Sequence, residues 1–226
     1  MITRLHSVVR CRALLAGFVL LVSGLRGETS PIKVLIIDGQ NNHAWTETTP
    51  VLKRILEDAR IFSVDISTSP TKPIAPRLPR NATAEQTATH AEQMKAFEMV
   101  AAGYESSAVA RWAEWRPNFS RYDVVVSNYN GEDWPIEVQR SFAAFVGNGG
   151  GFVSYHAADN SFPRWVQYNE MIGLGGWGNQ PGSYLRLRDG VWVKDPSPGR
   201  TGAHGAQHEF LIEAHAPEHP IWQGLP

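Results

Sequence analysis

The pattern of apolar and polar positions predicts strands that alternate with helices. Continuous apolar runs, which are typical of strands buried on both faces, lie at 32–37, 62–66, 122–127 and 152–156. Between and after them, apolar residues recur with helical spacing over 46–59, 84–110, 135–147 and 165–172. This alternation predicts an α/β fold with a doubly wound, mostly parallel sheet covered on both faces, as in a flavodoxin-like three-layer sandwich.

Residues with special backbone preferences mark where these elements begin and end. Thr46 is positioned to cap the first helix, Pro135 suits the first position of a later one, and Gly103 is expected to interrupt the second helix. Four prolines in 68–79 predict an exposed connection. Toward the C-terminus the sequence turns glycine-rich, and only short strands are expected, near 184–187, 191–194 and 210–213.

The N-terminus has the layout of a secretory signal peptide, because three arginines precede an apolar run at 13–22. That run is short for a membrane span. The expected cleavage removes residues 1–27 and leaves 28–226 as one domain of a secreted or periplasmic protein; an uncleaved N-terminal anchor is the alternative. The sequence stops where a turn has just begun, and we expect the domain to continue past Pro226.

The charge balance and the cysteine count exclude several partners and chemistries. The whole chain has 21 basic and 22 acidic residues, and loss of residues 1–27 removes four arginines and no acid, which leaves 17 and 22. The resulting net charge of about −5 argues against nucleic acid as a partner, since phosphate binding needs a basic surface. The only cysteine, Cys11, lies in the predicted signal, so the mature domain has neither a disulfide nor a thiolate nucleophile.

Polar residues follow three of the predicted strands at their carboxyl ends, where open α/β sheets bind ligands. An amide-rich stretch follows the first strand, Asn128–Asn130 follows the third, and the fourth leads to His156. Because parallel strands end at the same edge of a sheet, we expect these groups to converge in one polar cleft. The candidate ligand-binding residues of this edge are Gln40, Asn41, His43, Trp45, Asn130 and Asp159.

The passage from Gly149–Gly151 into Phe152–Ala158 resembles a nucleophile elbow, a strained strand-to-helix turn that raises one side chain above the sheet. The raised residue here is His156, which makes it the candidate catalytic residue. A class I glutamine amidotransferase carries a cysteine at this point and an α/β-hydrolase a serine, so acyl-enzyme chemistry is disfavoured. The alternative is that His156 caps the strand through backbone hydrogen bonds.

Three segments together resemble the ThuA-like (trehalose utilisation) family. They are Ile32–Gly39 with His43 and Trp45, Gly149–Ala158, and His219–Ile221 with Gly224–Pro226. The resemblance covers residues 31–226. It implies a class I glutamine amidotransferase-like fold without the amidotransferase cysteine, and a role in the catabolism of trehalose, a related glycoside or a keto-sugar. Members of the family usually continue with an Asp-Glu-Leu-Tyr segment, which this sequence does not reach.

Histidines and tryptophans in the C-terminal part add ligand-binding candidates. His204 and His208 have the spacing of two zinc ligands on one helical face, although nearby glycines disfavour a helix and the glutamate of the zinc-protease motif is absent. Trp177 offers a flat face against a sugar ring, as Trp45 does, and Asn179 offers an amide for its hydroxyls. Most of the 8 tryptophans are expected in the core.

Two functions stay open on this evidence. One is an exported hydrolase or lyase that processes a glycoside or keto-sugar, with His156 as acid or base and the other histidines binding substrate or a divalent metal such as zinc. The other is a non-catalytic carbohydrate-binding or scaffold domain, because a fold alone does not fix a function. Both predict a small-molecule sugar as partner, no nucleic acid, and no membrane span after signal cleavage.

Overall fold

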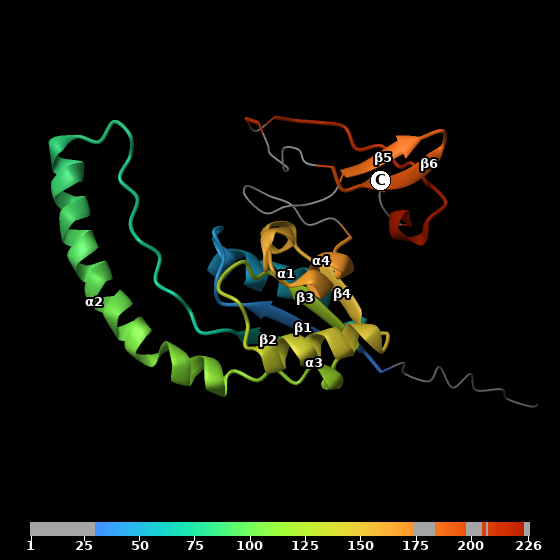
Figure 1. Cartoon of the computed structure of the whole chain (residues 1–226), viewed down its shortest axis with the longest axis horizontal. Coiled ribbons are helices and arrows are strands. Elements are labelled where there is room, and N and C mark those ends of the chain that lie inside the picture. Colours follow the sequence, from blue (N-terminus) through green and yellow to red (C-terminus); the bar gives the residue numbers. More distant parts are fainter. Residues whose placement is uncertain (1–29, 174–183, 198–204, 207, 224–226) are drawn as a thin grey trace, which may run out of the picture. The chain divides into compact units, whose positions relative to one another are not determined.

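The central sheet has four parallel strands. The computed structural model describes residues 30–173, 184–197, 205–206 and 208–223 (Figure 1). The strands, in the spatial order β2-β1-β3-β4, are β1 (Ile32–Asp38), β2 (Phe62–Thr68), β3 (Val124–Ser127) and β4 (Gly151–Ser154). The predicted doubly wound α/β sheet is confirmed, and the direction of strand addition reverses between β1 and β3. Gly39 lies just beyond the end of β1 and Gly151 begins β4, as parallel strands require.

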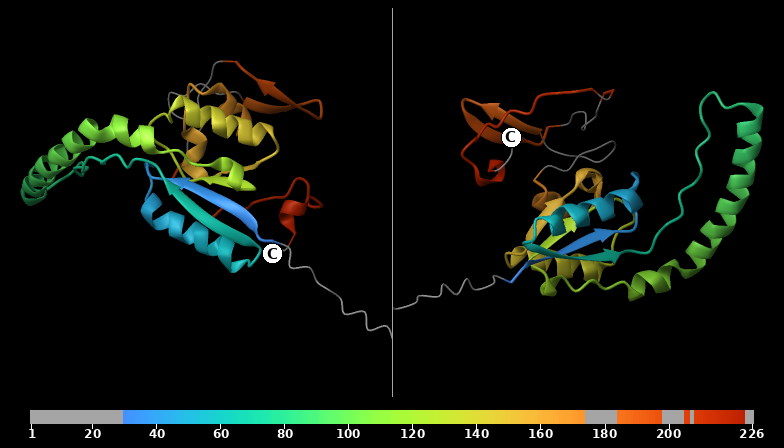
Figure 2. Two further views of the ribbon diagram at one scale, coloured as in Figure 1. Left: turned by 90° about the horizontal axis from the view of Figure 1, so that it is seen from below. Right: turned by 180° about the vertical axis from the view of Figure 1, so that it is seen from behind.

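Helices cover both faces of the sheet. Helix α1 (Trp45–Asp58) connects β1 to β2, and α3 (Ile136–Gly147) connects β3 to β4. Because the two crossovers run in opposite directions along the sheet, the right-handed connection rule places their helices on opposite faces, as Figure 2 shows.

Alternate residues of the strands feed two separate apolar cores. Val34, Ile36, Val64 and Val126 pack toward α1, with Leu52 and Leu56 against them. The other face is larger and aromatic, and its buried members include Leu35, Ile37, Phe119, Val125, Trp134, Phe142, Phe162, Trp165 and Tyr168. Each fully buried side chain of this size contributes roughly 1.5–3 kcal/mol of transfer free energy. Trp115, Trp134 and Trp165 are buried in the core, whereas Trp192 is 59% exposed, so fewer tryptophans are core residues than expected.

The helix boundaries correct three sequence-based expectations. Helix α2 (Ala84–Glu114) runs unbroken through Gly103, and a capping box between Thr83 and Gln86 begins it. The first helix starts at Trp45 with Ala44 in the cap position, so Thr46 is not its cap. Helix α3 starts one residue after Pro135. A single glycine costs only about 1 kcal/mol in a helix interior, which a 31-residue helix tolerates, and the other two boundaries differ from expectation by one or two residues.

The remaining elements are short. The fourth strand ends at Ser154, and the chain continues into the 3₁₀ helix η2 (His156–Asn160) and helix α4 (Val166–Met171). Strands β5 (Tyr184–Arg188) and β6 (Val191–Asp195) form an antiparallel hairpin, whereas the expected strand at 210–213 is exposed coil. Within the described part of the chain, no helix has the length and apolar character needed to cross a membrane.

Candidate functional site

The loops after β1 and β3 meet where the strand order reverses. The Asn128 backbone N–H donates to the Ile37 carbonyl at 2.9 Å, and the Asn130 N–H donates to the Gln40 carbonyl at 2.8 Å. These bonds continue the pairing of the two strands beyond their regular ends. An open α/β sheet binds its ligands at this topological switch point, so the two loops define the edge where a site is expected.

Asparagine side chains hold these loops together. Asn41 is buried, and its Nδ2 donates to the backbone carbonyl and the Oδ1 of Asn128, both at 3.2 Å. Asn128 Nδ2 in turn donates to the hydroxyls of Thr48 and Thr49, each at 3.0 Å, in the first turns of α1. Most of the hydrogen-bonding capacity of Asn41 is thus used inside the protein, and this predicted ligand residue mainly fixes the loop.

A pocket of about 590 Å³ opens at the switch point. We call it the switch-point pocket, and its lining residues are Gln40, Asn41, Asn42, Trp45, Lys72, Pro73, Ile74, Arg77, Asn130, Gly131 and Glu132. Four of the predicted ligand residues are among them: Gln40, Asn41, Trp45 and Asn130. Asn130 Nδ2 donates to Asn42 Oδ1 at 2.9 Å across the loops. The lining combines neutral amides, one half-buried indole, two cations and one carboxylate.

Glu132 is the centre of a polar network in the pocket wall. Its carboxylate accepts hydrogen bonds from the Tyr104 hydroxyl, from Gln40 Nε2 at 3.2 Å and from Lys72 Nζ at 2.9 Å. Its backbone N–H donates to Gln40 Oε1 at 3.0 Å, and Trp112 Nε1 donates to the Tyr104 hydroxyl at 3.3 Å. The network therefore ties helix α2 and the proline-rich segment to the edge of the sheet.

Opposing effects set the charges of this network. Burial acts to raise the pKa of Glu132, but hydrogen bonds from Tyr104 and Lys72 outweigh it and leave that pKa below its ordinary value. Burial and the neighbouring carboxylate raise the pKa of Tyr104, and the hydrogen bond to Glu132 raises the pKa of Lys72. At neutral pH Glu132 is therefore an anion, Tyr104 a neutral donor and Lys72 a cation.

His43 and His156 lie side by side although they follow different strands. Their ring centroids are 4.5 Å apart, and both side chains are exposed. His43 stands between the pocket-lining residues Asn42 and Trp45, and its N–H donates to Asn41 Oδ1 at 3.0 Å. Neither imidazole lines the switch-point pocket, but both follow strands that end at the same edge of the sheet.

The backbone at His156 makes the sharp turn expected from the sequence. His156 opens η2 with a φ of 51°, a left-handed conformation that is uncommon for a residue other than glycine. Its ring contacts His43 and, at 6.4 Å between centroids, Tyr155. Among the described residues no hydrogen bond joins this ring to the strand, so the alternative of a strand cap gains no support.

The other predicted site residues do not line the switch-point pocket or lie outside the described residues. Asp159 is exposed on η2, two residues beyond the buried Ala157. His208 is exposed and its Nδ1 lies 2.7 Å from the Glu209 carbonyl oxygen. Trp177, Asn179 and His204 fall outside the described ranges. Within those ranges, no three His, Cys, Asp or Glu side chains come together as a metal site would need.

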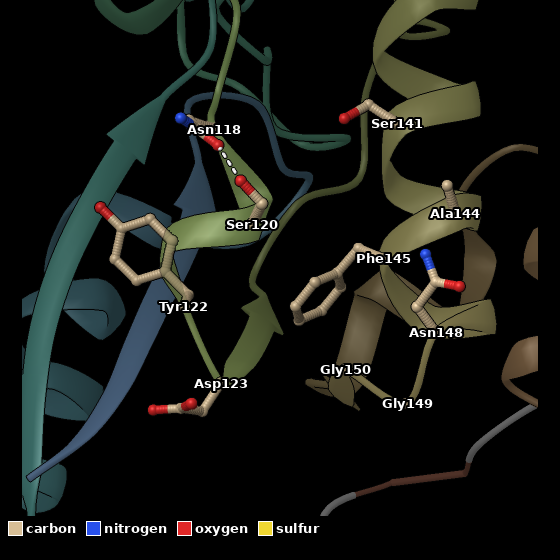
Figure 3. Close-up of a pocket in the computed structure, with 10 residues that line it drawn as sticks. All are labelled: Asn118, Ser120, Tyr122, Asp123, Ser141, Ala144, Phe145, Asn148, Gly149 and Gly150. Carbon is tan, nitrogen blue, oxygen red and sulfur yellow. Dashed lines mark hydrogen bonds between the residues drawn. The ribbon is translucent and has the colours of Figure 1, made fainter.

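A second pocket, of about 560 Å³, lies at the opposite edge of the sheet (Figure 3). Asp123 and Gly150, which line it, immediately precede β3 and β4. Its polar groups bond within the protein: Asn118 Oδ1 accepts from the Ser120 hydroxyl at 2.7 Å, and Asp123 Oδ2 accepts from the Lys33 N–H at 2.8 Å. The carboxyl-edge rule therefore favours the switch-point pocket as the functional site.

Comparison with known proteins agrees with this architecture. A family model described as ThuA, trehalose utilisation, matches residues 79–226. The chain belongs to the ThuA family. It is also similar to a crystal structure described as that of a ThuA-like protein from Parabacteroides merdae ATCC 43184, with 37% sequence identity and a TM-score of 0.65. That similarity covers 87% of this chain and 59% of the other, so this chain spans little more than half of that protein's length. The search of curated proteins gave no match.

Sequence reasoning missed several residues of the pocket in this ThuA-family chain. Lys72 and Arg77 belong to the proline-rich connection, and Glu132 follows Gly131 in the loop after β3. One signal was available, because that connection begins at the carboxyl end of β2 and therefore at the same edge as the predicted site. Tyr104 carried no such signal, since it lies in the middle of a long helix.

Proposed function

We propose that this ThuA-family protein is exported, binds a sugar or glycoside in the switch-point pocket, and uses His156 for proton transfer. The supporting observation is that an amide-lined pocket and two adjacent imidazoles lie at the same edge of the sheet, with one of the imidazoles on a strained strand-end turn. Family membership supports a role related to trehalose utilisation. The substrate we infer is trehalose, a related glycoside, or a keto-derivative of one.

The pocket wall suits a sugar in three respects. Asn42 and Asn130 present amides that can both donate to and accept from hydroxyls. Trp45 is half-buried at the rim and offers an aromatic face to the apolar side of a pyranose ring. The polar network around Glu132 holds the opposite wall in place, which lowers the cost of ordering it on binding.

His156 can serve either of two reactions on such a substrate. In hydrolysis its imidazolium donates a proton to the departing glycosidic oxygen, water adds at the anomeric carbon, and the water proton returns to the imidazole. On a keto-sugar, neutral His156 removes the proton next to the carbonyl, and elimination then breaks the bond to the glycosidic oxygen, which takes up a proton. Both need a side chain that can give and take a proton, and neither needs a nucleophilic cysteine or serine.

The test compares binding with turnover. Trehalose and a keto-derivative of it are offered to the full chain, with binding measured by calorimetry and products followed by NMR. For His156→Gln we expect turnover to fall by roughly 10²–10⁴-fold, the usual worth of general acid–base catalysis, with little change in affinity. His215→Gln, which alters another exposed histidine, is the matched control and should behave like the wild type.

Other results of these measurements would contradict particular parts of the proposal. Sugar binding without any turnover would favour the non-catalytic carbohydrate-binding domain, which the exposure of both imidazoles also permits. Normal turnover by His156→Gln would reject the role of His156. N-terminal sequencing tests export: exported material should begin near residue 28, and material that begins at Met1 would reject cleavage.

A divalent metal such as zinc is a finer part of the proposal. His43 would offer an imidazole nitrogen to such a metal while His156 keeps its role in proton transfer, although among the described residues no group of three His, Cys, Asp or Glu side chains comes together as a metal site. Metal analysis of the purified protein decides this point. Stoichiometric metal that is lost in His43→Gln would support a metal-assisted site, and its absence in active wild type would remove the metal from the proposal.

A further inference from the structure

One uncompensated positive charge borders the switch-point pocket. The proline-rich segment contributes two cations to the lining, Lys72 and Arg77. Lys72 Nζ lies 2.9 Å from Glu132 Oε1, so the charges of that pair offset each other. Arg77 is exposed, and it takes part in none of the ion pairs that the described residues form with one another.

The remaining lining residues do not neutralise Arg77. Glu132 is the single carboxylate among the described residues of the pocket wall, and it already accepts from Lys72, Tyr104 and Gln40. The other side chains of the wall are amides, Trp45 and apolar groups. A neighbouring shallow hollow, which Arg77 also borders, contains Glu85 on the first turn of α2.

We propose that the pocket prefers a sugar unit that carries an anionic group, a carboxylate or a phosphate, and that Arg77 binds this group. The inference rests on the proposed sugar binding and names its substrate class. A guanidinium matches a carboxylate or phosphate with two parallel hydrogen bonds, which a neutral sugar hydroxyl cannot reproduce. The predicted mature chain is acidic overall, so its net charge does not attract an anionic ligand. Binding of such a ligand therefore depends on the local contact with Arg77.

The experiment compares matched sugars that differ in the group at C6, which is neutral in one and anionic in the others. Glucose, glucuronic acid and glucose 6-phosphate, and the corresponding galactose series, are titrated against the full chain by calorimetry at low and moderate salt. The variants are Arg77→Gln and, as matched control, Arg80→Gln, which removes an exposed arginine of the same segment that does not line the pocket.

We expect the wild type and Arg80→Gln to bind an acidic sugar about tenfold more tightly than its neutral partner, less so at higher salt because an exposed pair is screened. In Arg77→Gln that preference should disappear, because the acidic sugar loses far more affinity than its neutral partner. Comparing the affinities of the uronic acid and the sugar phosphate shows which of the two anions the pocket prefers.

Three outcomes would overturn the inference. Equal affinity of the wild type for neutral and acidic sugars rejects the anionic preference but leaves sugar binding in place. An equal loss for both sugars in Arg77→Gln means that Arg77 supports the pocket structure and does not read charge. Failure of all these sugars and of trehalose to bind rejects the proposed function itself, and the anionic preference with it.

Discussion

Replacing Tyr104 with phenylalanine should weaken the attachment of helix α2 to the edge of the sheet. The Tyr104 hydroxyl donates to Glu132 and accepts from Gln40 Nε2 and Trp112 Nε1, both at 3.3 Å. A hydrogen bond to a charged group contributes about 1.5–3 kcal/mol, and the Glu132 side chain is 36% exposed, so water replaces part of it. We therefore expect a loss of about 1–2 kcal/mol.

The change is measured by thermal and urea unfolding of the full chain. For a domain of this size each kcal/mol lowers the melting temperature by about 2–4 °C, which gives a decrease of about 2–8 °C. Tyr155→Phe is the control, because Tyr155 is 38% exposed and its loss of a hydroxyl should stay within about 0.5 kcal/mol. Equal stabilities of Tyr104→Phe and the control would refute the view that this network anchors the helix.

Acidification provides a second readout of the same variant. The pKa of Glu132 is lowered in the folded protein, so its contribution to stability is present above its ordinary value of 4.5 and is lost as pH falls through the lowered pKa. Part of that lowering comes from the Tyr104 hydroxyl. The stability difference between wild type and Tyr104→Phe should therefore be constant near neutral pH and shrink below about pH 4.5. A difference that grows on acidification would contradict this account.

Two further predictions concern glycines and a buried carboxyl. A Cβ at Gly131 would overlap Gln40, so Gly131→Ala should lower the free energy of unfolding by about 1–3 kcal/mol and weaken sugar binding. Gly103 has open space around it in α2, so Gly103→Ala should raise the free energy of unfolding by about 0.5–1 kcal/mol. Unfolding curves of the two variants and the wild type measure both changes. Burial raises the pKa of Asp38, so its folded state favours the protonated form. The wild type should therefore lose stability as pH rises from about 4 through that raised pKa, whereas Asp38→Asn should not, so the variant becomes more stable relative to the wild type. A stability difference between the two that does not change with pH would argue against this.

Sequence alone was sufficient for the four strands of the central sheet and for the edge where the candidate site lies. The run that became β1 is short and apolar, as is typical of a strand covered on both faces, whereas β4 lies at the edge of the sheet, where Val153 is 50% exposed. Parallel strands send their carboxyl ends to one edge, so the meeting of His43 with His156 could be predicted without knowing any distance. The turn at His156 was also signalled, because a glycine-rich entry and a short strand precede it.

The tertiary structure decided the composition of the pocket wall. Lys72 and Arg77 stand in a segment whose prolines indicate only that it is exposed, and Tyr104 lies in a helix that Gly103 was expected to break. Their meeting with Glu132 depends on the path of the chain between β2 and β3. Residue preferences act over a few neighbours, whereas these contacts join residues tens of positions apart. Which charges face a ligand is thus set by the crossover connections, which no local pattern in the sequence encodes.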